Sequence, residues 1–373
     1  MSERPLRVAI LGGRGVPANY SGFDTLIEEL SARLVARHGM EVTVYCRRHY
    51  YEQRPAMHRG VRCVYLRAGR GKGVESVYHT SRSVLHAMFR RFDLAFVVDP
   101  ANAPFVWPLR LLGTPTVFHT DGLGWMRSKW SGFARRYYRW VEGLCARTAT
   151  ALVTDARAMQ RYYETTWRRE STMLTYGSES QGGVSVEGLA RFSLRPRDYY
   201  LVVARLEPEN NAECLVREYL AAELGRPLLI VGGARYRTAF HERLLAMACD
   251  HVRFVGGVYE PAVLNGLYAN CRAYLHGHEV GGTNPGLLRA MAHGAPVLAV
   301  DCEFNREVAQ DGGRYFGKAA GEGKALLRAL DGDDAALAAI GAAAKSRAAT
   351  AYRWDDVADG YAALFRSVAR QRS

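Results

Sequence analysis

The sequence predicts an α/β protein made of two doubly wound domains of the same kind. Three observations lead to this prediction. The chain has 373 residues, which suits two domains of about 100–200 residues each. Short apolar runs alternate along it with stretches of helical periodicity, the pattern of a parallel sheet covered by helices on both faces. The alternation lapses once, near residues 178–197, and then restarts.

The first half begins with an apolar run at 6–11 that ends in a glycine-rich turn, and a helix is predicted to begin near Gly22. Apolar side chains between Leu26 and Leu34, three and four residues apart, support this helix. Further strands of this half are predicted at 41–46, 61–66, 94–98, 115–119, 150–154 and 171–175. Helices are predicted between several of them, at 79–91, 131–147 and 155–165.

The second half repeats the pattern after a polar, turn-rich segment that is typical of an inter-domain linker. Its strands are predicted at 199–204, 227–231, 252–255, 272–275 and 296–300. Its helices are predicted at 211–224, 236–249, 260–270, 284–293, 303–310, 333–349 and 354–370. We therefore expect a first domain at 1–178, a linker at 179–197, a second domain at 198–352 and a closing helix within 353–373.

The composition is that of an ordinary globular protein with an excess of positive charge. The chain is 48% hydrophobic and 23% charged, which argues against disorder. No apolar run is long enough for a membrane-spanning helix, and the first residues show no signal-peptide core, so we expect a cytoplasmic protein. Seven scattered cysteines form no C-x-x-C pair, which argues against a disulfide framework and a zinc site. The net charge of +13 indicates an anionic partner: nucleic acid, a membrane surface or a phosphorylated small molecule.

The glycine-rich turn after the first strand contains Gly13, Arg14 and Gly15. A dinucleotide fingerprint would need a third glycine in the right place, but Pro17 interrupts the spacing, and two arginines follow the next strand in place of an acidic residue. A nicotinamide-dependent oxidoreductase is therefore disfavoured. Arg14 and the loop amides remain candidates for an anion site, and a turn shaped only by packing is the alternative.

Two segments of the second half predict a phosphate site. Arg205 ends the first strand of that half, where its planar guanidinium suits a phosphate. Between His276 and Leu288, Gly281 and Gly282 would allow close backbone approach, and Thr283 or Asn284 would cap a helix beginning at Pro285. Free amides at such a helix start attract anions, so a nucleoside diphosphate is the favoured ligand. His276 and His278 lack an evident third ligand, which favours polar lining over a metal site.

The chain resembles the retaining glycosyltransferases of family 4, which have the GT-B fold, and in particular a branch containing bacterial rhamnosyltransferases of polysaccharide synthesis. The resemblance rests on blocks that span residues 10 to 310 in order. These blocks are GGRGVPA at 12–18 with Tyr20, Gly22 and Phe23; DGL at 121–123 with Trp125, Arg127, Lys129 and Trp130; ARLEPENN at 204–211; HGH to GGTNP at 276–285; and FNREV at 304–308.

The resemblance implies two Rossmann-like domains that face a central cleft and a final helix that returns to the first domain. The second domain would hold a nucleoside-diphosphate sugar, and the first would hold the acceptor. Arg205 would neutralise the departing diphosphate, with no metal or other cofactor and with no protein nucleophile. The residues that we expect to contact the donor are Gly13, Arg14, Gly15, Asn210, Asn211, Gly232, Gly233, His278, Gly281, Gly282, Thr283, Asn284, Pro285, Leu288 and Arg289.

Two positions depart from the wider family, which carries a pair of glutamates where this chain has Gly281 and Arg289. Glu279 lies close to the first position and is a candidate substitute. Arg289 cannot accept hydrogen bonds from ribose hydroxyls, although it can bind a phosphate or stack on a base. The nucleotide is therefore left open.

Aromatic and basic side chains interleave between Trp125 and Arg147, with Glu142 as the one acidic residue of that stretch. Such a segment suits a glycan or lipid-diphosphate acceptor, an anionic membrane surface, single-stranded nucleic acid or plain helix packing. No nucleic-acid-binding module is recognisable, so nucleic acid is disfavoured. Asp121 and His119 are candidates to orient the attacking hydroxyl. The expected acceptor contacts are Tyr20, Gly22, Phe23, Trp125, Arg127, Lys129 and Trp130.

Together these features predict an enzyme that moves a hexose or deoxyhexose, with rhamnose as one candidate, from a nucleoside diphosphate to a hydroxyl. The acceptor would be a glycan, a lipid-linked sugar or a natural product, and the candidate catalytic residues are Arg205, Asp121, His119 and Glu279. Two alternatives stay open: a sugar-nucleotide-binding protein without catalysis, and a nucleotide-sugar isomerase of the same fold. Peripheral contact with an anionic membrane at its cytoplasmic face is a further expectation.

Overall fold

A computed structural model describes residues 4–18, 22–69, 71, 74–120, 123–126, 132–178, 183–233 and 238–371. By their contacts these residues form two compact units. The first unit contains the described residues up to Trp125, residues 132–176 and residues 354–371. The second contains Met126 and the described residues between 177 and 353.

The first unit is built on an eight-stranded sheet with the strand order β3-β4-β2-β1-β5-β6-β7-β8. Its strands are β1 (Arg7–Leu11), β2 (Glu41–Arg47), β3 (Met57–His58), β4 (Val61–Leu66), β5 (Leu94–Val98), β6 (Thr116–Thr120), β7 (Ala151–Thr154) and β8 (Thr172–Met173). All neighbouring strands are parallel except the short edge pair β3 and β4. Strands β5 and β6 are buried along their whole length, as central strands of a parallel sheet are.

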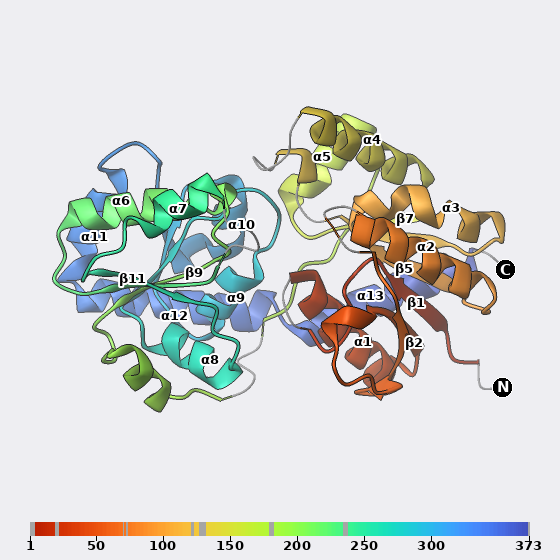
Figure 1. Cartoon of the computed structure of the whole chain (residues 1–373), viewed down its shortest axis with the longest axis horizontal. Helices are drawn as coiled ribbons and strands as arrows, with labels where there is room; N and C mark the ends of the chain where they lie inside the picture. Colours follow the sequence, from red (N-terminus) through yellow and green to blue (C-terminus); the bar gives the residue numbers. More distant parts are fainter. Residues whose placement is uncertain are drawn as a thin grey trace. The chain divides into compact units, whose positions relative to one another are not determined.

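Helices cover both faces of this sheet (Figure 1). They are α1 (Gly22–His38), α2 (Val74–Met88), α3 (Ala103–Leu111), α4 (Gly132–Thr148), α5 (Arg157–Trp167) and α13 (Trp354–Arg370). Helices α1 and α13 pack together on one face, and α2, α3 and α4 lie side by side on the other. From β1 the chain first adds strands on one side of the sheet (β2, β4) and later on the other side (β5, β6, β7). Because crossovers between parallel strands are right-handed, connecting helices on the two sides of β1 lie on opposite faces of the sheet.

The second unit has a six-stranded, fully parallel sheet with the order β11-β10-β9-β12-β13-β14. Its strands are β9 (Tyr200–Val203), β10 (Leu228–Val231), β11 (Val252–Gly256), β12 (Ala273–His276), β13 (Val297–Val300) and β14 (Gly313–Phe316). Its helices are α6 (Ala212–Ala222), α7 (Ala239–Leu245), α8 (Pro261–Asn270), α9 (Pro285–Ala292), α10 (Glu303–Ala309), α11 (Glu322–Asp331) and α12 (Asp334–Ala351). Apolar side chains of β9, β10 and α6 form much of its core.

The predicted α/β class with two doubly wound sheets is confirmed, and most predicted strands match the observed ones within two residues. Helix α3 was not predicted, because Pro104 and Pro108 lie inside it and hide its periodicity. Strand β14 and helix α11 were also not predicted. Within the predicted linker, Glu187–Phe192 forms a 3-10 helix that packs on α8 in the second unit. No helix in the described ranges combines the length and apolarity that crossing a membrane requires.

The last helix, α13, returns to the first unit, as predicted. Phe365 and Tyr361 are completely buried in it, and their rings lie 5.5 Å and 5.4 Å from that of Phe96 on β5. Burial of aromatic rings is a large favourable contribution, so this contact is the main reason that α13 stays on the sheet.

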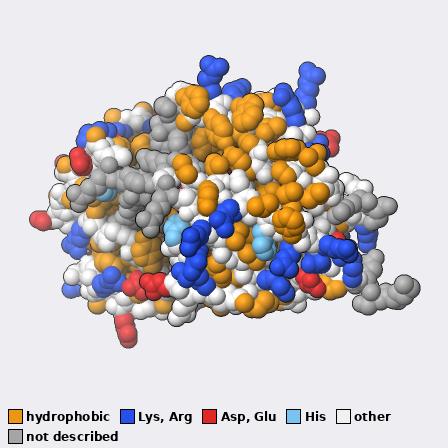
Figure 2. All heavy atoms as spheres, turned by 45° about the vertical axis from the view of Figure 1, so that its right-hand side comes forward, with side chains coloured by type: hydrophobic (Ala, Val, Ile, Leu, Met, Phe, Trp, Pro, Cys, Tyr) orange, Lys and Arg blue, Asp and Glu red, His pale blue; other side chains and the backbone are white. Residues whose placement is uncertain are grey.

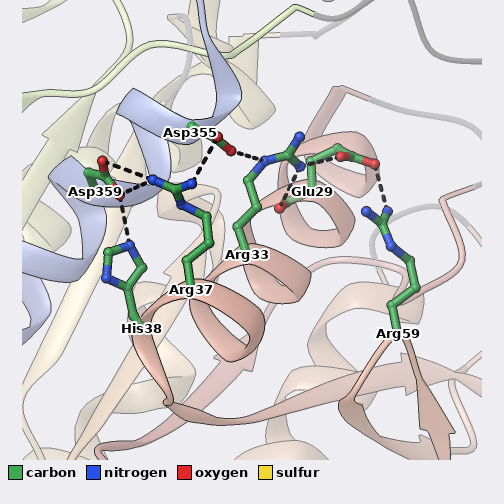
Figure 3. Close-up of polar contacts among 7 residues, drawn as sticks. All are labelled: Glu29, Arg33, Arg37, His38, Arg59, Asp355 and Asp359. Atoms are coloured by element: carbon green, nitrogen blue, oxygen red, sulfur yellow. Dashed lines mark hydrogen bonds and ion pairs between the residues drawn. The ribbon is translucent and has the colours of Figure 1, made fainter.

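A row of ion pairs joins α13 to α1 at the edge of that apolar contact (Figure 3). Asp355 accepts hydrogen bonds from Arg33 at 3.0 Å and from Arg37 at 2.9 Å. Asp359 pairs with Arg37 and, at 2.9 Å, with His38. Burial alone would raise the pKa of Asp359, but hydrogen bonds and charge from Arg37 and His38 hold it below its ordinary value. The Arg37–Asp359 pair is largely exposed, and exposed ion pairs add little stability.

Candidate functional site

In the second unit the strand order changes direction between β9 and β12, and ligands of open parallel sheets bind at the carboxyl ends of strands at such a point. Arg205 lies two residues after the end of β9. The loop between β12 and α9 contains His278 and the residues from Gly281 to Asn284. The fold therefore brings the two segments singled out in the sequence to the same edge of one sheet.

Hydrogen bonds hold these two segments to each other. The Asn210 side chain donates to the Arg205 carbonyl at 2.6 Å and shares a 2.5 Å hydrogen bond with Nδ1 of His278. The Asn211 side chain donates to the Gly277 carbonyl at 2.8 Å. Asn210 and Asn211 were expected to contact the donor, and the structure shows them as the link that sets the position of Arg205 relative to the loop.

Two glycines allow the backbones to approach this closely. A Cβ atom on Gly232, which follows β10 and has φ +137°, would lie 1.9 Å from the carbonyl oxygen of Ala204. A Cβ atom on Gly277 would lie 2.3 Å from the carbonyl oxygen of Asn210. Gly233 is exposed, and its Cβ position meets no atom of the described residues within 4 Å. Gly232 and Gly277 are therefore required by packing, whereas Gly233 is free to face a ligand.

The loop leads into α9 through a side-chain cap. The Asn284 side chain accepts hydrogen bonds from the amides of Gly286 at 2.8 Å and Leu287 at 3.3 Å, as an N-cap asparagine does. Within the described residues, no acceptor lies near the backbone amides of Gly281, Gly282 and Asn284 itself. Of the two predicted caps, Thr283 and Asn284, the structure shows Asn284, and the predicted helix start at Pro285 is confirmed.

The surroundings of three predicted residues bear on their roles: the candidate catalytic residue Glu279 and the expected donor contacts Arg289 and Leu288. Glu279 forms a 2.8 Å salt bridge with Lys318. Arg289 donates a 2.8 Å hydrogen bond to Asn265, and burial lowers the pKa of its guanidinium. Leu288 is completely buried, because it lies on the face of α9 that packs into the core. The structure gives no support to Leu288 as a direct donor contact.

The two histidines of the loop are both engaged in hydrogen bonds. His276, buried at the end of β12, shares a 3.1 Å hydrogen bond with the Tyr274 hydroxyl, and burial lowers its pKa to about 3. His278 bonds Asn210, and its carbonyl accepts from Asn305 at 2.9 Å. A search of the described residues finds no group of three His, Cys, Asp or Glu side chains that could hold a metal ion.

In the first unit, the glycine-rich turn is packed tightly against its neighbours. A Cβ atom on Gly13 would lie 2.2 Å from Ile27, and one on Gly15 would lie 2.5 Å from the sulfur of Cys46. Arg14 forms a 3.2 Å ion pair with buried Asp24. Burial by itself would lower the pKa of Arg14, but Asp24 and Tyr50 raise it above its ordinary value. These contacts favour the packing role that the sequence left open, because the charge of Arg14 is already balanced.

His119 is the next-to-last residue of β6 and is completely buried among aromatic rings. Its Nδ1 shares a 2.8 Å hydrogen bond with the hydroxyl of Tyr361 on α13, and the Phe23 ring lies 5.7 Å away, edge to face. Its Nε2 has no hydrogen-bond partner in the part of the chain that the structure describes. Burial lowers the pKa of His119 to about 3, so the imidazole is neutral at ordinary pH. Phe23 and Gly22, both predicted acceptor contacts, begin α1 beside it.

The predicted acceptor residue Trp125 is held by α4 and α5. Its indole nitrogen donates to the Tyr162 hydroxyl at 3.3 Å, and the Arg139 guanidinium lies over its ring at 5.2 Å. Tyr162 in turn donates to Glu142 at 2.6 Å. The other predicted residues of this group lie outside the described residues: Tyr20, Asp121, Arg127, Lys129 and Trp130.

Several residues of these sites were not predicted. Tyr361 is 242 positions from His119, and nothing in either segment signals their contact. Lys318 precedes a helix that was itself not predicted. Asn305 belongs to a block quoted for the resemblance, but its role as donor to the His278 carbonyl follows only from the fold.

Two family models match the chain. One, described as a glycosyl transferase 4-like domain, matches residues 21–177, and the other, described as glycosyl transferases group 1, matches residues 197–343. Together they cover more than three quarters of the chain. No curated protein sequence matches the chain significantly.

Solved structures share the fold over nearly the whole chain. Sucrose-phosphate synthase from Thermosynechococcus elongatus has a TM-score of 0.82 at 17% identity and covers 98% of this chain and 100% of its own. HepE (Alr3699) of Anabaena, solved in complex with UDP-glucose, has a TM-score of 0.76 at 13% identity, with 97% and 100% covered. A glycosyltransferase from Rickettsia africae has a TM-score of 0.70 at 11% identity, with 98% and 99% covered.

Proposed function

The chain belongs to the family 4-like, group 1 glycosyltransferases with the GT-B fold, and from this premise we propose its reaction in finer detail. It transfers a hexose or deoxyhexose from a nucleoside diphosphate to a hydroxyl of a glycan, a lipid-linked sugar or a natural product, with retention of the anomeric configuration. Rhamnose, which rests on the resemblance described above, is one candidate sugar. The second unit holds the donor, and the first unit holds the acceptor.

The observation that carries this proposal is the set of amides without a described hydrogen-bond partner at the sheet edge that also carries Arg205. Gly281 and Gly282 are buried, and buried backbone amides are normally hydrogen-bonded. These two amides and that of half-buried Asn284, just before the start of α9 and at the point where the sheet changes direction, suit the oxygens of a diphosphate. HepE, whose fold is similar, was solved with UDP-glucose, which supports the same class of donor.

Each part has a defined task in the proposed reaction. The bond between the anomeric carbon and the diphosphate oxygen breaks, and negative charge grows on the departing diphosphate. Arg205 and the amides before α9 stabilise that charge, and the stabilisation is larger in the transition state than in the bound donor. The acceptor oxygen bonds the anomeric carbon on the face that the diphosphate leaves, and the hydroxyl proton passes to a diphosphate oxygen. No carboxylate nucleophile is required.

The first experiment identifies the nucleotide. Thermal unfolding is measured with UDP, GDP, dTDP and ADP in turn, because a ligand at about 100 times its Kd stabilises the folded chain by about 2.7 kcal/mol. A single nucleotide that raises the melting temperature defines the donor class. If none of the four does so, the donor assignment of the second unit is contradicted.

The second experiment tests Arg205 with a donor of that class and a panel of hydroxyl acceptors. Arg205→Ala should lower the transfer rate by about 100- to 1000-fold, the usual cost of removing one charge-stabilising donor. Arg195→Ala, an exposed arginine of the same unit, is the matched control and should retain the full rate. Equal rates in both variants would show that Arg205 does not stabilise the leaving group. An NMR time course without acceptor tests the isomerase alternative, since only an isomerase changes the donor alone.

A further inference from the structure

Exposed hydrophobic side chains gather on one face of the first unit. Of the seventeen large hydrophobic residues of the described chain that are exposed, ten lie on α2, α3 and α4 or directly after them. The most exposed of these ten are Phe133 at 85%, Phe89 at 81% and Leu111 at 73%. Leu85, Trp107 and Trp140 lie on the same three helices. Figure 2 shows hydrophobic side chains gathered on the side of the molecule that carries these helices.

These three helices are neighbours, so the exposed side chains share one surface. Helix α3 packs between α2 and α4 on the outer face of the sheet (Figure 1). Isolated exposed hydrophobic residues are normal on a protein surface, whereas a contiguous group marks an interaction site. We call the exposed face of α2, α3 and α4 the helical platform.

Exposed arginines accompany the hydrophobic residues. Eight lie on the three helices or directly after α2, and four of these are on α4. No carboxylate of a described residue lies within salt-bridge distance of any of the eight. Arg82 donates to a tyrosine hydroxyl and Arg139 lies over a tryptophan ring, and neither contact neutralises charge.

Acidic side chains of these helices do not reach the surface. Glu75 on α2 is buried and bonded to Arg47 at 2.8 Å. Glu142 on α4 is buried and accepts hydrogen bonds from Tyr162 and Trp167 at 2.6 Å and 2.7 Å. The platform therefore presents apolar and positively charged groups and no described negative one. A second copy of the chain would bring the same arginines face to face, so its own charge opposes self-association.

We propose that the helical platform docks on a bilayer rich in anionic lipids. Aromatic rings such as Trp107, Trp140 and Phe89 would lie at the level of the headgroups, where amphipathic and aromatic side chains are most stable. The arginines would contact lipid phosphates and attract the protein to the negative surface. The proposal does not rest on the transfer reaction, and its test is a binding measurement that needs neither donor nor acceptor.

The test is flotation of the whole chain with unilamellar vesicles of phosphatidylcholine alone, or of equal parts phosphatidylcholine and phosphatidylglycerol. The chain should float with the anionic vesicles and remain at the bottom with the neutral ones. Raising the salt to about 1 M, where the Debye length falls from about 10 Å to about 3 Å, should release most of it. Failure to bind anionic vesicles at low salt would overturn the proposal.

Two variants separate the apolar from the charged contribution. Phe89→Ser with Trp107→Ser and Leu111→Ser removes exposed apolar groups, and Arg90→Glu with Arg91→Glu reverses two charges. Each variant should lower the vesicle partition coefficient at least about tenfold. In the charge variant, each charge near an anionic surface contributes about a fivefold change. In the apolar variant, the apolar area that enters the bilayer is reduced. In the second unit, exposed Tyr259→Ser with Arg195→Glu is the matched control and should bind like the unaltered chain.

Two further outcomes would also contradict the proposal. If both platform variants bind anionic vesicles as well as the control does, the platform is not the docking surface. If light scattering shows a dimer that the apolar variant alone abolishes, the face is an interface between copies of the chain. Circular dichroism and a cooperative thermal unfolding transition like that of the unaltered chain show that each variant is folded, so loss of vesicle binding is then specific to the surface.

Discussion

Acid should destabilise the first unit, and His119 should account for a defined part of the loss. His119 is completely buried, and burial lowers its pKa from 6.5 to about 3. Below pH 6.5 the unfolded chain therefore binds a proton that the folded chain does not. Since protons then favour the unfolded state, the free energy of unfolding falls as the pH drops from 6.5 towards 3.

The magnitude follows from the two pKa values. For a group that titrates at 6.5 in the unfolded chain and near 3 in the folded one, acidification to about pH 5 removes about 2 kcal/mol of the unfolding free energy. Buried His79 on α2, whose pKa is also lowered by burial to about 3, adds a similar loss in the same unit. Against a typical stability of about 5–15 kcal/mol, the two histidines make the unit measurably acid-sensitive.

Tryptophan emission makes the measurement specific to this unit. All six tryptophans lie outside residues 177–353, so urea unfolding followed by their fluorescence does not report the second unit. His119→Asn keeps an acceptor for the Tyr361 hydroxyl but does not titrate. The variant should be less stable at about pH 8, yet lose about 2 kcal/mol less than the unaltered chain on acidification to about pH 5. His276→Asn, the matched change in the second unit, should leave this transition's pH dependence unchanged.

The refuting result is equally specific. If His119→Asn and the unaltered chain lose the same unfolding free energy between the two pH values, His119 is not neutral and buried as described. If the His276→Asn control also loses the pH dependence of this transition, the effect is not specific to His119.

Three further substitutions test the packing of the site and of the last helix. Gly232→Ala places a Cβ atom 1.9 Å from the Ala204 carbonyl and should destabilise the second unit by about 1–3 kcal/mol in urea unfolding followed by circular dichroism. Gly233→Ala, which meets no atom, is its control, and equal stabilities would contradict the described approach of the strands. Asn284→Ala should cost about 1 kcal/mol and weaken nucleotide binding in a titration, whereas Asn284→Asp should keep the cap; an unchanged Asn284→Ala would mean that the cap is unimportant. Phe365→Ala should remove about 3–5 kcal/mol from the tryptophan-detected transition, and a loss below about 1 kcal/mol would show that α13 does not depend on this ring.

Much of the fold could be predicted because the local sequence pattern of its central elements matches the burial that they have in the structure. Central strands such as β5, β6 and β13 are continuous apolar runs, and burial on both faces is the reason. Strand β14 reads Gly-Arg-Tyr-Phe, which carries no such signal, and its strand conformation depends on pairing with β13. Edge elements depend on the neighbour that they pair with, so their own residues predict them poorly.

The candidate site likewise has features that the sequence predicts and contacts that only the fold reveals. The cap at Asn284 and the helix start at Pro285 are local and were predicted from residue type. The pairing of Glu279 with Lys318 and of Arg289 with Asn265 joins segments 39 and 24 positions apart. Such contacts use part of the charge and hydrogen-bonding capacity that each group could otherwise offer to a ligand. Residue type alone does not reveal these contacts.

The sequence by itself determined the class of the fold, the order of most of its elements and the segments proposed to bind a phosphate, because these depend on local periodicity and on glycine, proline and asparagine at set positions. The tertiary structure alone decided which groups meet. It placed Tyr361 on His119, buried Leu288 within the core, and left the hydrophobic side chains of α2, α3 and α4 on the surface. An apolar residue in a helix looks the same in the sequence whether it faces a sheet or solvent, and only the packed neighbours distinguish the two.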